Sequence, residues 1–161
     1  CNTMDISKEL RLKVNEAMNA VPDLVAELAV DYFKERFRYK EFDGKEWPGP
    51  GRGYKRSNGS LLVDSGHLLN SIRPAEISTD KVVISAGNDN VLYAKVHNEG
   101  FSGSVVVKTH DRTSKKGKQY VVKQHTRKAL IPQRQFMGES RELNIILKKD
   151  IEQLFKTIIE E

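Results

Sequence analysis

The apolar positions of the first forty residues recur at spacings of three and four, which is the period of a helix with one buried stripe. The pattern runs from Ile6 to Phe37. Proline lacks the N–H that an interior helical turn needs but suits a first turn. Pro22 therefore predicts two helices, one near residues 5–19 and one over about 22–39.

The most regular apolar stripe lies near the C-terminal end and predicts an amphipathic helix. Ser140 precedes it and can cap its first turn, because a serine oxygen accepts a hydrogen bond from a free backbone N–H. The stripe consists of Leu143, Ile146, Leu147, Ile151, Leu154, Phe155 and Ile158.

Shorter elements are expected between these helices. Asp64 or Ser65 can cap a short helix that carries Leu68, Leu69 and Ile72 and ends before Pro74. Residues 93–100 predict one or two helical turns closed by Gly100. The alternation of apolar and polar residues predicts an antiparallel hairpin over 75–78 and 81–86, with one face buried.

A second hairpin is predicted over 105–110 and 119–125, with its turn at 113–118. Val105, Val107 and Thr109 would share one face, with Tyr120 and Val122 nearby across the ladder. The segment 104–128 has a net charge of +7, whereas the rest of the chain sums to −2. We therefore expect a protruding basic arm at 104–128, too polar to be wholly buried.

Residues 43–60 are rich in glycine and contain Pro48 and Pro50, a composition that resists both helix and strand. They predict a long, flexible surface loop. A loop of this length inside a compact domain is either mobile or ordered by a partner.

The length of 161 residues fits one domain covering the whole chain, 1–161. Hydrophobic residues make up 38% and charged residues 30%, which argues against a disordered chain and against a membrane protein. Cys1 is the only cysteine, so no internal disulfide is possible. A cysteine in first place is compatible with a lipid anchor, and Met4 with a start codon.

These elements together predict an α+β fold. In it, an antiparallel sheet is packed by the long N-terminal helices and the C-terminal amphipathic helix, and the basic hairpin protrudes.

No motif predicts catalysis, a metal site or a cofactor. The four histidines lack the i, i+4 spacing of helical zinc ligands. Asp64, Ser65 and His67 superficially suggest a hydrolase, but sequence neighbours seldom form a triad, whose members converge from separate elements. Clustered basic side chains can neutralise phosphates, and those that could face DNA are Lys115, Lys116, Lys118 and Lys123.

Four short patches occur in a fixed order: FDGKEWP at 42–48, LLVDSGHLLNSI at 61–72, YAKVHNEG at 93–100 and IPQRQFMG at 131–138. In this order the chain resembles the Mu-type phage virion morphogenesis proteins, also called tail completion proteins. The resemblance covers most of the chain. The matching positions are Phe37, Gly44, Trp47, Asp64, Ser65, Gly66, Leu68, Ser71, Ile72, Tyr93, Ala94, His97, Gly100, Pro132, Arg134, Phe136 and Gly138.

The resemblance implies a non-enzymatic structural protein that completes the tail at its head-proximal end and supports head–tail joining. It implies a ring of copies, sixfold in the virion, and contacts with tail-tube or terminator and head-connector proteins. The chain would reside in the virion neck, after assembly in the bacterial cytoplasm, with no membrane partner. Contact with packaged DNA would be non-specific. The alternatives are a basic nucleic-acid-binding module and a small Ser65 hydrolase.

Overall fold

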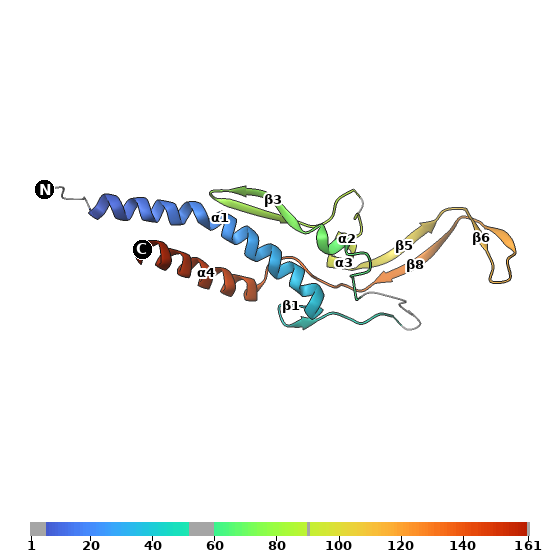
Figure 1. Ribbon diagram of the computed structural model, residues 1–161. Coiled ribbons are helices and arrows are strands. Elements are labelled where there is room, and N and C mark those ends of the chain that lie inside the picture. The colour runs from blue at the N-terminus through green and yellow to red at the C-terminus, as the bar shows by residue number, and fades with distance from the viewer. Residues whose placement is uncertain (1–5, 52–59, 90, 161) are drawn as a thin grey trace.

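The computed structural model describes residues 6–51, 60–89 and 91–160. Cys1, Met4 and part of the expected loop, 52–59, lie outside these residues. Two long helices, α1 (Ile6–Tyr39) and α4 (Arg141–Glu160), lie side by side, and a long two-stranded arm projects away from them (Figure 1). The fold is α+β, which confirms the predicted class.

The strands form four separate antiparallel pairs in the described part of the chain, where one sheet was expected. The pairs are β1 with β2, β3 with β4, β5 with β8, and β6 with β7. Their bounds are Glu41–Phe42, Lys45–Glu46, Arg73–Ser78, Lys81–Ser85, Phe101–Val107, His110–Thr113, Gln119–Val122 and His125–Ile131. Two short helices, α2 (His67–Asn70) and α3 (Ala94–Glu99), complete the fold.

The predicted division of the N-terminal helix is wrong, because α1 continues through Pro22. An interior proline costs about 3 kcal/mol of helix stability. Packing offsets this cost, since α4 and the β3–β4 hairpin both lie against α1 and Pro22 itself is buried (Figure 1).

The start of α4 is fixed by two side chains from different parts of the chain. Ser140 Oγ accepts a hydrogen bond from Leu143 N at 3.1 Å, which confirms the predicted cap. Asp43, in the turn between β1 and β2, accepts bonds from Ser140 Oγ at 2.9 Å and from Glu142 N at 3.0 Å. The carboxylate therefore ties α4 to the first hairpin, a role that the sequence analysis missed.

Tyr32 and Arg36 of α1 extend this network. The Tyr32 hydroxyl lies 2.8 Å from Ser140 Oγ and donates to Glu142 Oε2 at 3.0 Å. The buried Arg36 Nη1 is 3.3 Å from the same carboxylate. Burial is the main cause that raises the pKa of Tyr32, so its hydroxyl stays protonated at neutral pH.

The predicted capping of α2 by Asp64 or Ser65 is wrong. Gly66, with φ of 77°, occupies the N-cap position, no side chain caps the helix, and Asp64 and Ser65 are exposed. The helix is a single turn because the chain must become extended before Pro74, which lies within β3.

The first predicted hairpin is present as β3 and β4, and α3 confirms the turns expected at 93–100. The second hairpin is longer than predicted: it spans Phe101 to Ile131, with β5–β8 near the body and β6–β7 beyond. Val105 and Val107 share a face of β5 as expected, but the expected neighbours across the ladder are wrong, because Val105 pairs with Arg127, whereas Tyr120 pairs with Arg112. The valines at 105–107 and 121–122 are compatible with direct pairing in a shorter hairpin, so the sequence pattern did not reveal the actual register.

The expected flexible loop 43–60 is wrong for its first part. Residues 41–46 form the small β1–β2 hairpin, Trp47 is buried, and the carbonyls of Pro48 and Gly49 accept hydrogen bonds from Arg134. Long-range contacts that composition does not reveal therefore order residues 43–49.

Candidate functional site

Aromatic residues from α1 and from the first and last sequence patches meet in the core. The Phe37 ring lies edge-on to Trp47 at 5.5 Å between centroids and 5.0 Å from the ring of Phe136. Trp47 Nε1 donates to the carbonyl of Gln135 at 2.6 Å. Leu68, Ile72 and Ala94 belong to the same buried cluster. These motif residues therefore build the scaffold.

Polar side chains hold the segment 133–137 against this core. Arg134 donates from Nε to Pro48 O and from Nη2 to Gly49 O, both at 2.9 Å. The Asn98 carboxamide oxygen accepts from Phe136 N at 2.9 Å and Met137 N at 3.0 Å, and its nitrogen donates to Met137 O. Asn98 lies in the third patch, but its type and position did not reveal these bonds.

Other motif residues act on the backbone. Ser71 Oγ donates to Leu68 O at 2.7 Å and accepts from Gly87 N at 2.8 Å, so it joins α2 to the end of the β3–β4 hairpin. Gly44, Gly66 and Gly100 have φ of 77–78°, a region that favours glycine. Each therefore allows a reversal of the chain.

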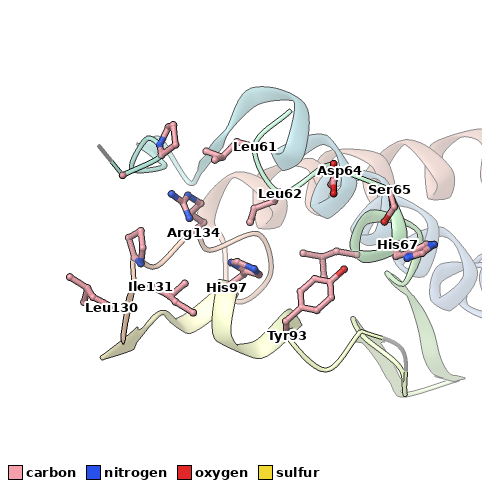
Figure 2. Close-up of a pocket in the computed structure, with 15 residues that line it drawn as sticks. Leu61, Leu62, Asp64, Ser65, His67, Tyr93, His97, Leu130, Ile131 and Arg134 are labelled. Carbon is pink, nitrogen blue, oxygen red and sulfur yellow. The ribbon is translucent and has the colours of Figure 1, made fainter. Parts of the chain in front are cut away.

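The remaining motif residues surround a pocket of about 540 Å³ at the base of the arm. Figure 2 shows Asp64, Ser65 and His67 on one side, Leu130, Ile131 and Arg134 on the other, and the α3 side chains between them. Apolar groups make up much of the wall. The apolar or aromatic residues that line it are Leu61, Leu62, Leu68, Tyr93, Leu130, Ile131, Pro50 and Pro132.

His97 lies half-buried in this pocket and is kept neutral. Burial, with a smaller contribution from the positive charge of Arg134, lowers its pKa below the ordinary value of 6.5. Its Nδ1 is buried without a hydrogen-bond partner, and its ring packs edge-on to Tyr93 at 5.7 Å. A neutral imidazole can both donate and accept a hydrogen bond.

The pocket does not assemble the suggested Ser–His–Asp set. Among residues 6–51, 60–89 and 91–160, no hydrogen bond joins Ser65 to Asp64, His67 or His97, although all four line the same pocket. Nucleophilic catalysis requires these groups to lie within hydrogen-bond reach. The geometry therefore gives no support to Ser65 as an activated nucleophile.

The basic side chains occupy the far part of the arm. Lys115, Lys116 and Lys118 lie in the turn between β6 and β7, Lys123 follows β7, and all four are exposed. Within the described ranges, no group of three or more His, Cys, Asp or Glu residues could hold a metal ion. Nor does a helix there have the length and apolar character to cross a bilayer.

Comparison with known proteins gives one match. No curated protein and no solved structure matches the chain. A family model described as the phage virion morphogenesis family matches residues 4–156. This range contains every motif residue named above, including those of the core and the pocket. The chain therefore belongs to the phage virion morphogenesis family, and its role is in building the phage particle.

Proposed function

We propose that this protein is a structural subunit that completes the phage tail at its head-proximal end and supports head–tail joining by assembling with other copies of itself. The single observation that carries the proposal is the family match over 4–156. The geometry supports it, because the motif residues build a rigid core and a pocket rim and form no catalytic set. Tail-tube or terminator and head-connector proteins are the proposed neighbours, and the neck of the virion the proposed location.

A gene deletion with complementation tests this function. Without the chain, electron microscopy of lysates should show complete heads and tails that remain separate, and the wild-type gene should restore joined particles. A Ser65→Ala gene should restore them equally well, because no step requires a nucleophile. Normal infectious particles from the deletion strain would overturn the proposal.

A second, narrower proposal concerns DNA. In a closed ring the exposed lysines at the outer end of the arm could line a channel, where charge without base reading is what passage of DNA requires. The observation that favours this contact is the concentration of positive charge in 104–128, at +7. The same charge supports the alternative of a nucleic-acid-binding module, which would bind DNA as a monomer without forming a ring.

A further inference from the structure

The half of the arm nearest the body, β5 with β8, is a two-stranded antiparallel ladder with seven residue pairs. In the part of the chain that the structure describes, neither strand pairs with any other. Figure 1 shows this ladder leading away from both long helices. A two-stranded ribbon alone is marginally stable in water, so a ladder of this length needs a further surface to pack against.

One face of this ladder is apolar. Because side chains alternate across a strand and the residues of each pair share a face, two sets can be separated. The first set, called here the apolar face, is Phe101, Val105, Val107, Ala129 and Ile131, together with Gly103, Arg127 and His125. The opposite face carries the polar residues Ser102, Ser104, Thr126 and Lys128, together with the exposed side chains of Val106 and Leu130.

The apolar face is shaped for packing. The Phe101 ring extends over Gly103, where a Cβ would lie 3.1 Å from its Cζ atom. A period-two pattern with one apolar side is typical of a strand whose one face is covered. Yet the only extensive contacts that β5 makes among the described residues are with β8. The side chains of this face are only partly buried within the chain, so they remain open to contact with another molecule.

The total surface leaves room for such an interface. The chain exposes 12442 Å², whereas a compact monomer of 18.3 kDa exposes about 8,100 Å². A specific interface buries about 800 Å² on each partner. The surplus is large enough for each copy to form one interface through its arm and a second as the acceptor of a neighbour's arm.

The distribution of charge indicates which part of a neighbouring copy can pack against the apolar face. The ladder carries Arg127 and Lys128 and no acidic residue, so charge disfavours face-to-face packing of two ladders. The segment 61–100 is the acidic part of the chain, with a net charge of −2, and it carries the exposed apolar side chains of Ile77, Leu92 and Tyr93. Its acidic residues are Asp64, Glu76, Asp80, Asp89 and Glu99.

We infer that the apolar face of the β5–β8 ladder packs against the 61–100 surface of a second copy of this chain. The contact joins two different surfaces, so repetition gives a closed ring or a filament. The inference rests on the proposed function, since it names the surface through which the copies assemble. It leaves the basic outer end of the arm free to reach beyond the neighbour.

The test places a photo-cross-linking residue at Val107 on the apolar face and, as the matched control, at Val106 on the opposite face of the same strand. The full-length protein is expressed in cells that produce phage. The expected result is a cross-linked band with the mass of two chains from position 107, whose joined peptide lies in 61–100, and a much weaker band from position 106. A product that contains another polypeptide instead, or one that joins two arms, would overturn the inference.

A second pair of variants measures the contact without a label. Val105→Asp buries a carboxylate in the interface, and a loss of about tenfold in joined particles is expected for a cost of about 1.4 kcal/mol or more. Val106→Asp adds the same charge on the polar face and should retain joining. If deletion of the gene abolishes head–tail joining but both variants support joining equally, the proposed interface is refuted and the proposed function is not. Normal particles from the deletion strain would refute the proposed function itself.

Discussion

At the scale of single residues, the residues of the four sequence patches mainly stabilise the fold, and they form no catalytic set. Trp47 illustrates this, because its ring fills the core while its Nε1 satisfies the carbonyl of Gln135. Arg134 is only 7% exposed, and its guanidinium donates hydrogen bonds to backbone carbonyls. A guanidinium often binds a phosphate or carboxylate ligand instead. A buried arginine in a motif therefore need not indicate a ligand site.

Trp47→Phe should keep an aromatic ring in the core but leave the Gln135 carbonyl without its donor. We expect the free energy of unfolding to fall by about 1–3 kcal/mol, the cost of an unsatisfied buried acceptor. Urea denaturation followed by circular dichroism measures it. Tyr120→Phe, on the exposed arm, is the control and should change little. An equal effect of the two substitutions would show that the indole bond does not stabilise the fold.

Gly100 connects α3 to β5 with φ of 78° and ψ of 170°, and an added Cβ would lie 3.0 Å from Gln133 N. Gly117 in the arm turn has a similar φ of 81° but open space around it. We expect Gly100→Ala to cost about 1–3 kcal/mol from backbone strain, and more from the contact with Gln133. Gly117→Ala keeps only the strain and should lower the thermal midpoint less; the opposite order would contradict this packing.

At the scale of elements, contacts between distant segments decide the details that the sequence patterns missed. The long helices, the β3–β4 hairpin, α3 and the Ser140 cap were predictable, since each depends on local periodicity or a capping residue. The uninterrupted α1 was not, because packing by α4 and β3–β4 outweighs the local effect of Pro22. The order in residues 43–49 depends on Arg134, which is 85 positions from Gly49.

The candidate site was predictable only in part. The four patches contain most of the residues that line the pocket, but Asp64 and Ser65 were expected to cap a helix and are instead exposed at its rim. Asn98, Asp43 and Arg36 form the polar links between elements, and their residue types are common on any surface. Only the three-dimensional arrangement distinguishes them.

Asp43 gives the start of α4 a dependence on pH. The hydrogen bonds from Glu142 N and Arg141 N are the main causes that lower its pKa below the ordinary value of 3.8. A carboxyl whose pKa is lower in the folded state stabilises the fold at higher pH, and this contribution is lost as pH falls through the folded pKa. Stability should therefore decline as pH falls below about 4.

Asp43→Asn tests this contribution. The variant should be less stable at neutral pH and should lose part of the decline in acid, as measured by denaturant midpoints across the pH range. Asp111→Asn, exposed on β6, should preserve the decline. If Asp43→Asn showed the same acid dependence as the wild type, other carboxyls would have to account for it.

At the scale of the whole molecule, the chain is a helical body with a long arm whose two halves differ in chemistry. The half near the body carries the apolar face, and the outer half carries the exposed lysines. This division separates two tasks, because packing against a neighbour requires apolar contact, whereas attraction to DNA requires unpaired positive charge.

Reversing the charge of Lys115, Lys116 and Lys118 to Glu should weaken DNA binding. Each lost phosphate contact lowers the slope of log affinity against log salt by about 0.9, so the slope should fall by about 2–3 if all three contact phosphate. Fluorescence anisotropy with duplex DNA at several salt concentrations measures it. The matched control reverses Lys148, Lys149 and Lys156, which are exposed on α4. Unchanged DNA delivery and particle assembly by the arm variant would remove support for a DNA-facing arm.

The pairing of α1 with α4 also has a consequence for biosynthesis. Tyr32 and Ser140 are 108 positions apart, so α1 cannot obtain its partner until the chain through α4 has left the ribosome. Contacts of such large sequence separation form slowly. During translation the apolar stripe of α1 is therefore open to chaperones, and the body matures only after the arm has been made. The body can therefore reach its final form only after α4 has been synthesised.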